Sequence, residues 1–216
     1  MPRIARVVVP EVPHHITQRG NRRGTIFFSD DDYALYRDTL ASLCRKHRVA
    51  CWAYCLMPNH VHLVLVPADA TGLSRAVAET HRRYSAVINA RLRVTGPLFQ
   101  ARFSSAPMDE AHLLAAARYV SMNPVRARLV EWAEVWRWSS VRAHLAGRDD
   151  ALVTVAPILE RVDGRFCDLV DADLATAQAG PIRAAETTGR PLGGPAFLER
   201  VAALTGRDLG AKRRGP

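Results

Sequence analysis

Two histidines separated by one residue, His60 and His62, stand at the start of an apolar run of strand-forming residues. Side chains at positions i and i+2 of a strand project from the same face, so the sequence places both imidazoles side by side. Two neutral imidazoles held close together supply half of the ligands of a metal site. Two polar residues at the end of a half-buried strand are the alternative, and this stretch alone leaves both interpretations open.

A second pair of reactive side chains lies on a helix predicted over residues 109–122, which carries Tyr119 and stops at Asn123 because the residue before a proline avoids the helical region. Positions i and i+4 share a helix face, so the two side chains are expected to point the same way. If that face packs over His60 and His62, two imidazoles and an amide oxygen hold a divalent cation that polarises a phosphate. Tyr119 would then be the nucleophile. Taken singly, Tyr119 is more typical of a packed aromatic residue on an amphipathic helix, and Asn123 of a helix stop.

The elements that must position these residues follow the order β-α-β-β-α-β and then a further helix. Strands are predicted over 14–18, 49–56, 60–66 and 99–106, and helices over 29–47, 71–93 and 109–122. This order predicts an α+β fold, a ferredoxin-like antiparallel sheet with helices on one face. Residues 1–147 are predicted to form the catalytic domain. Residues 148–216 are predicted to form a mostly helical C-terminal extension whose basic end, Lys212 to Arg214, is disordered.

Composition narrows the class of protein. The chain has 216 residues, of which 48% are hydrophobic, enough for one sizeable core. No apolar run approaches the roughly 20 residues that span a bilayer, and the N-terminal apolar segment is too short for a secretory signal, so a cytoplasmic location is expected. The formal net charge is +9, and the basic residues are almost all arginines in the N-terminal and middle parts. This distribution indicates a polyanionic partner.

The four cysteines are too few and too unevenly spaced for a disulfide framework. Cys51 and Cys55 precede the histidine pair, which leaves open a zinc-stabilised binding module. Buried, reduced thiols in the core are the expected interpretation.

Several motifs in a fixed order resemble the HUH single-tyrosine transposases, and most closely the REP-associated tyrosine transposases. The central one is the stretch YCLMPNHVHLVL at 54–65. Others lie at 15–22, 99–103, 118–127 and 138–145, so the resemblance covers roughly residues 3–147. The agreement of several motifs makes it specific, whereas His-Val-His alone would not be.

The resemblance implies a transposase that acts on single-stranded DNA with imperfect hairpins and uses Mg²⁺ or Mn²⁺. By motif matching, His60 and His62 fall on the family's metal-binding pair, Asn123 on its third ligand position and Tyr119 on its nucleophile. Tyr119 would attack a DNA phosphate, form a 5′-phosphotyrosine link and free a 3′-hydroxyl. A DNA 3′-hydroxyl would then attack that link to rejoin strands. A bacterial, nucleoid-associated protein without a membrane partner is expected, as a monomer or a homodimer.

Candidate DNA contacts lie on the first strand and its basic loop, on the second helix and near the fourth strand. Arginines and amides there suit phosphates or base edges, and Tyr84 suits base stacking. Two further functions stay open, a domesticated host nuclease that processes hairpins and a catalytically silent DNA-binding regulator. The candidate contact residues are Gln18, Arg19, Asn21, Arg22, Arg23, Arg82, Arg83, Tyr84 and Arg102.

Overall fold

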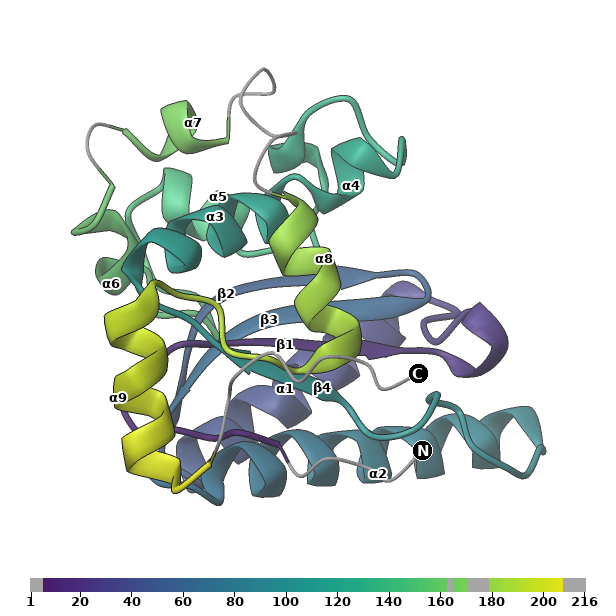
Figure 1. Ribbon diagram of the computed structural model, residues 1–216. Helices are drawn as coiled ribbons and strands as arrows, with labels where there is room; N and C mark the ends of the chain where they lie inside the picture. The colour runs from purple at the N-terminus through teal and green to yellow at the C-terminus, as the bar shows by residue number, and fades with distance from the viewer. Residues whose placement is uncertain (1–5, 163–164, 171–178, 208–216) are drawn as a thin grey trace.

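The computed structural model describes residues 6–162, 165–170 and 179–207. The basic end predicted at Lys212 to Arg214 lies outside the described residues. A sheet of four strands forms the centre of the molecule (Figure 1), with helices on both of its faces. None of the helices in the described parts of the chain is long and apolar enough to cross a membrane.

The sheet has the order β2-β3-β1-β4, and every neighbouring pair is antiparallel. This is the predicted ferredoxin-like arrangement. In β1, Thr17 lies opposite His62 and Arg19 lies opposite His60. The strands are β1 (His14–Arg19), β2 (Val49–Met57), β3 (His60–Pro67) and β4 (Ser104–Pro107).

The fourth strand is shorter than the sequence predicts. Phe99 makes only an isolated bridge with Gly20, and Ala101 has a φ of 54°, in the left-handed region. A strand requires extended backbone, so the ladder cannot run through residue 101. The regular strand therefore begins only at Ser104.

One face of the sheet is covered by the two long helices, α1 (Asp30–Lys46) and α2 (Gly72–Leu92). A capping box between Ser29 and Asp32 fixes the start of α1, since each residue satisfies a backbone N–H of the other. Alternate strand residues such as Ile16, Leu63 and Leu65 pack against these helices in the larger core. As predicted, both helices of the βαββαβ unit lie on the same face.

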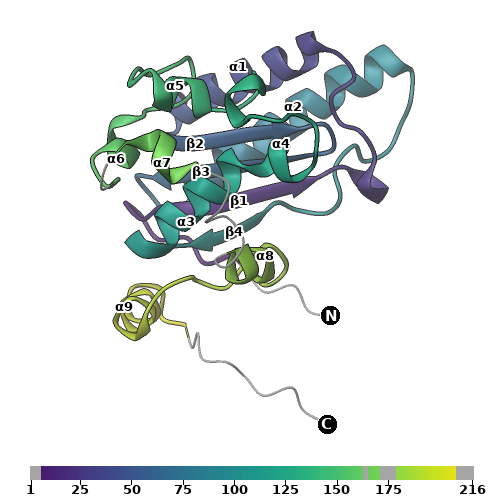
Figure 2. The ribbon, with the colours of Figure 1, turned by 90° about the horizontal axis from the view of Figure 1, so that it is seen from above.

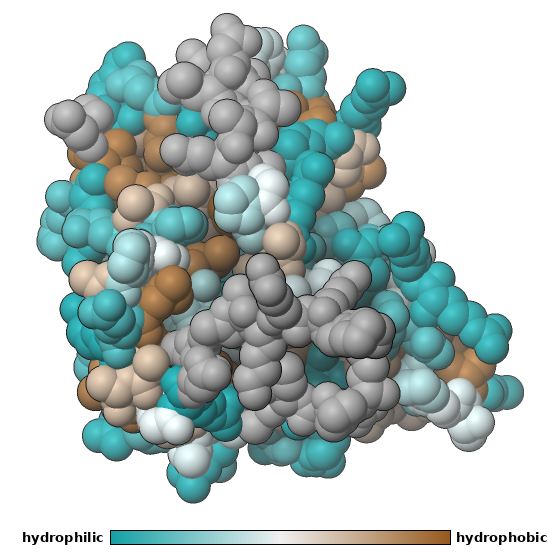
Figure 3. All heavy atoms as spheres, viewed as in Figure 1, coloured by the Kyte–Doolittle hydropathy of each residue, from teal (hydrophilic) through white to brown (hydrophobic). Residues whose placement is uncertain are grey.

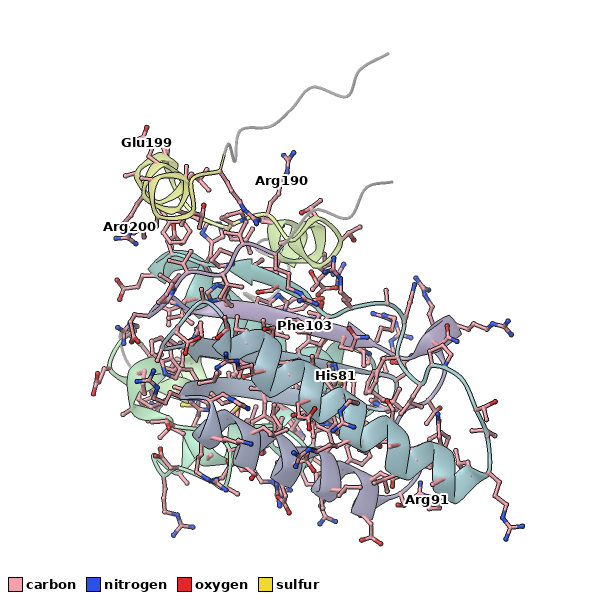
Figure 4. The ribbon with its side chains drawn as sticks, turned by 90° about the horizontal axis from the view of Figure 1, so that it is seen from below. His81, Arg91, Phe103, Arg190, Glu199 and Arg200 are labelled. Carbon is pink, nitrogen blue, oxygen red and sulfur yellow. The ribbon has the colours of Figure 1, made fainter. Side chains whose placement is uncertain are left out.

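A buried polar pair sits within this larger core. His81 on α2 points toward the sheet near Phe103, with 6.4 Å between the ring centroids (Figure 4). The hydroxyl of Tyr36 and Nε2 of His81 are hydrogen-bonded at 2.9 Å. Burial lowers the pKa of His81 to about 3, so the ring is neutral at physiological pH.

The opposite face is covered by α3 (Glu110–Ser121), which ends beside the short α4 (Asn123–Arg126). Ala53, Val64 and Ala106 from the strands pack there against the apolar side of α3 in a second core. Along a strand, alternate residues therefore pack into one core, and the residues between them pack into the other. The remaining short helices are η1 (Asn21–Arg23), η2 (Ala133–Val135), α5 (Val141–Leu145), α6 (Ala156–Leu159) and α7 (Phe166–Leu169).

The last two helices, α8 (Ala179–Thr188) and α9 (Pro195–Thr205), lie beyond the β4 edge of the sheet (Figure 2). Helix α8 contacts both β4 and α3, and the N–H of Leu192 donates to the carbonyl of Pro107 over 2.8 Å. Hydrophobic residues show among hydrophilic ones on the left of this side of the molecule, in the region of α9 (Figure 3). The C-terminal segment thus packs directly against the sheet and the helix that carries Tyr119.

Candidate active site

His60 and His62 share one face of β3, as the two-residue spacing predicts, and their ring centroids are 4.8 Å apart. In each ring, Nδ1 has a hydrogen-bond partner. Nδ1 of His60 lies 2.6 Å from Oδ1 of Asn59, and Nδ1 of His62 lies 3.1 Å from Nε2 of His15. Among the described residues, Nε2 of neither ring takes part in a hydrogen bond. A second partner that holds one ring nitrogen is the usual way in which a protein orients a metal-binding histidine.

Tyr119 stands in the last turn of α3 and packs over this face of the sheet. Its ring centroid lies 5.5 Å from that of His62 and 6.0 Å from that of His15, in both cases edge to face. The side chain is largely buried, because α3 packs its apolar side onto β2 and β3. The structure therefore brings the predicted nucleophile and the predicted histidine pair together.

Asn123 opens α4, immediately after the turn that ends α3. Its Oδ1 accepts a hydrogen bond from the guanidinium of Arg126 over 2.9 Å. The same guanidinium donates to the carbonyl of Tyr119 over 2.8 Å and stacks 3.9 Å above the centroid of its ring. Arg126 thus joins Asn123 to Tyr119, while the buried Nδ2 of Asn123 has no hydrogen-bond partner among the described residues.

Two residues of α8 complete the surroundings of Tyr119. The side chains of Glu186 and Arg183 interact with its hydroxyl, and Oε1 of Glu186 lies 3.8 Å from Nδ1 of His62. The sequence patterns identify neither of these residues, nor His15 or Arg126, as part of the site. His15 had an available signal, since it shares strand parity with Thr17, which lies opposite His62. Glu186 had none.

Burial determines the protonation states at this site. It lowers the pKa of His15 and of His60 to about 4, with Arg19 adding to the effect at His60. The pKa of His62 lies well below its ordinary range, because burial is reinforced by the neighbouring histidines and by Arg126. Burial and the nearby Glu186 carboxylate raise the pKa of Tyr119. At neutral pH the imidazoles are therefore neutral, as metal ligands must be, and the phenol is protonated.

Seven of the nine predicted DNA-contact residues are at least partly exposed. Asn21, Arg22, Arg23 and Arg102 are exposed. Arg19, partly exposed, projects from the face that carries His60. Arg82 and Arg83 are exposed on α2, on the other side of the sheet from Tyr119, and each lies 2.7 Å from the carboxylate of Glu79.

Gln18 and Tyr84 do not suit the predicted contacts with DNA. Gln18 is buried on the α1–α2 side, where its amide donates to the carbonyl of Gln100 over 3.0 Å. The ring of Tyr84 is only 1% exposed, and its hydroxyl donates to the carbonyl of Ile26. No face of that ring is open to a base, so the stacking prediction is withdrawn.

The structure also contradicts the alternative of a zinc-stabilised binding module that uses Cys51 and Cys55. Cys51 and Cys55 belong to the two different cores, on opposite faces of the sheet, so their thiols do not converge on one ion. Burial raises the pKa of both thiols, which disfavours the thiolate form that zinc requires. Both are buried free cysteines, as the core interpretation predicts.

Comparison with known families identifies the class of protein. The chain belongs to the family described as IS200-like transposases, whose model matches residues 8–123, from before β1 to Asn123. This confirms the resemblance to the HUH single-tyrosine transposases. Membership makes the chain a transposase, a DNA-cleaving enzyme of DNA recombination. A search of curated proteins found no match.

Two solved structures are similar to this chain. A REP-associated tyrosine transposase bound to a REP hairpin is 19% identical, with a TM-score of 0.59, over 71% of this chain and 92% of that one. A putative transposase from Deinococcus radiodurans R1 is 17% identical over 62% of this chain and 97% of that one, with a TM-score of 0.37. The first likeness supports the ferredoxin-like α+β fold.

Proposed function

We propose that this transposase cleaves and rejoins single-stranded hairpin DNA through a covalent 5′-phosphotyrosine link to Tyr119, with a divalent cation as cofactor. The observation that carries the proposal is the packing of Tyr119 against His62, with 5.5 Å between the two rings, on the strand face that His62 shares with His60. A phenol beside two neutral imidazoles and under a guanidinium combines a nucleophile, metal ligands and a phosphate-binding cation.

The donor atoms fit a divalent cation. His60 and His62 would hold it through their Nε2 atoms, and Asn123 through its amide oxygen, which retains a second lone pair beside the bond from Arg126. When bound, Mg²⁺ or Mn²⁺ polarises the scissile phosphate and neutralises charge that develops on it. Two nitrogens and one oxygen accept either ion.

The remaining roles belong to side chains near Tyr119. Arg126 fixes the Tyr119 ring from above, and Arg19 on β1 adds positive charge beside His60. Both guanidiniums suit the oxygens of a DNA phosphate. The phenol must lose its proton before its oxygen attacks phosphorus. The bond to the 3′-oxygen then breaks, and the freed 3′-oxygen takes up a proton.

A denaturing gel after incubation with a single-stranded hairpin oligonucleotide and Mn²⁺ tests this proposal. We expect a covalent protein–DNA adduct from the wild type and none from Tyr119→Phe, with hairpin affinity nearly unchanged. Tyr33→Phe is the matched control, because Tyr33 and Tyr119 are both 7% exposed and Tyr33 lies in the other core. An adduct that persists in Tyr119→Phe would exclude Tyr119 as the nucleophile.

The same experiment addresses the first alternative, and the DNA that flanks the gene addresses the second. A catalytically silent regulator would bind the hairpin and form no adduct in any variant. A domesticated nuclease would form the adduct and cleave chromosomal hairpins, and would lack inverted repeats that flank its gene.

A further inference from the structure

Three potential ligand atoms from three separate elements converge beside Tyr119. They are Nε2 of His15 on β1, Nδ1 of His62 on β3 and Oε1 of Glu186 on α8, and all lie within 4.8 Å of one another. The two nitrogens are 3.1 Å apart, and Nδ1 of His62 is 3.8 Å from the carboxylate oxygen. In the part of the chain that the structure describes, no other three His, Cys, Asp or Glu side chains come together in this way.

The spacing suits a metal ion. Ligands that bind zinc at about 2.0–2.2 Å are separated from one another by roughly 3 Å. The histidine nitrogens are close to this separation, but they now face each other in a hydrogen bond. A turn of both rings and a small movement of the Glu186 side chain would direct all three atoms at one ion. The set of two imidazoles and one carboxylate is also a common protein site with open positions for further ligands.

The hydrogen bonds of the cluster give an independent reason to expect a cation there. His15 and His62 share a single hydrogen bond, so one proton serves two ring nitrogens. Oε1 of Glu186 is buried and has no hydrogen-bond partner among the described residues. A buried acceptor without a donor is destabilising, and a cation placed among the three atoms would satisfy it.

We propose that His15, His62 and Glu186 form a second cation site, which shares only His62 with the set of His60, His62 and Asn123. The surrounding charges determine which ions it takes. Arg19 and Arg126 both act on Glu186, and they oppose a cation that is held by charge alone. Ions that form strong bonds to imidazole nitrogen, such as Zn²⁺ and Co²⁺, are therefore favoured over Mg²⁺.

An ion at this site would have two consequences. It would fasten α8 to β1 and β3. It would also occupy Nδ1 of His62, and a neutral imidazole that binds a metal through one nitrogen carries its proton on the other. Nε2 of His62 would then be unavailable to the catalytic cation, so the two sites compete for one ring. This last consequence rests on the proposed function, whereas the site itself does not.

The experiment is a Co²⁺ titration of the chelator-treated full-length protein, followed by its visible absorption, with Zn²⁺ as competitor and no DNA present. We expect one ion to bind and Glu186→Gln to weaken its binding by about tenfold or more, since a removed ligand costs at least as much as a removed supporting group. Glu199→Gln is the matched control, because Glu199 projects from α9 away from the sheet (Figure 4). His60→Ala should retain the Co²⁺ site.

Thermal unfolding without metal provides the fold check, and unfolding with Zn²⁺ gives a second measurement. Zn²⁺ should raise the melting temperature of the wild type and of Glu199→Gln, but not of Glu186→Gln. Equal Co²⁺ affinity in Glu186→Gln and wild type would overturn the proposal. Loss of the site in His60→Ala alone would assign the ion to the other set. Neither result depends on the adduct assay of Tyr119→Phe, so the two proposals fail separately.

Discussion

Arg126 offers the sharpest test of how Tyr119, the proposed nucleophile, is held. Replacement by methionine keeps most of the side-chain volume and removes the guanidinium. The variant loses the stack at 3.9 Å over the Tyr119 ring and the hydrogen bonds to the Tyr119 carbonyl and to Oδ1 of Asn123, at 2.8 and 2.9 Å. A partly desolvated cation–π contact contributes about 1 kcal/mol, and each hydrogen bond contributes about 1 kcal/mol.

The total is about 3 kcal/mol, of which methionine packing recovers part, so we expect a loss of about 2 kcal/mol of unfolding free energy. For a chain of this size, that corresponds to a fall in melting temperature of about 4–8 °C. Adduct formation in single-turnover gels should slow by about 10²-fold, because a cation placed beside the attacked phosphate is lost along with the position of Tyr119.

Arg128→Met is the control, since Arg128 is exposed two residues further along the chain. It should melt and react like the wild type. If Arg126→Met forms the adduct at the wild-type rate and melts at the wild-type temperature, Arg126 does not hold Tyr119 in place.

Three further predictions concern stability and DNA binding. The low pKa of His81, about 3 against an ordinary 6.5, means that the unfolded chain binds the proton first as the pH falls. The free energy of unfolding therefore falls between about pH 6.5 and pH 3. The variant His81→Gln should reduce that fall between pH 7 and pH 4 by about 3 kcal/mol, as measured by urea unfolding. Tyr84→Phe should cost about 1 kcal/mol through its lost hydrogen bond and leave hairpin affinity unchanged; weaker hairpin binding would restore its predicted role. The double change Arg22→Gln, Arg23→Gln should lower the slope of log affinity against log salt by about 0.7 for each lost phosphate contact, and an unchanged slope would remove this loop from the interface.

The core fold could be predicted because its hydrophobic periodicities are local. The alternation in β3 and the apolar stripe of α1 place each element, and the order of elements leaves few arrangements open. The exception, the late start of β4, comes from the left-handed conformation of Ala101, which no alanine signals in sequence. A single backbone angle of this kind changes where a strand or helix begins or ends, but not whether it forms.

The site could be predicted only in part. His62 and Tyr119 carry recognisable spacing, and the structure places them together. The same strand alternation could have excluded Gln18 from the predicted DNA contacts, because Gln18 shares a face with the core residue Ile16 and not with Arg19. Glu186 is different, because its position beside Tyr119 results from tertiary packing over a separation of 67 residues that has no local pattern.

The docking of α8 has a bearing on how such proteins are divided into parts. The stretch that defines the family ends at residue 123, yet a carboxylate and a guanidinium from residues 183–186 lie against Tyr119. A chimera that joined residues 1–147 to another C-terminal segment would keep every recognisable motif and change the charge beside Tyr119. Two transposases with the same motifs can therefore differ in the reactivity of the same tyrosine, and the C-terminal segment is where that difference would be encoded.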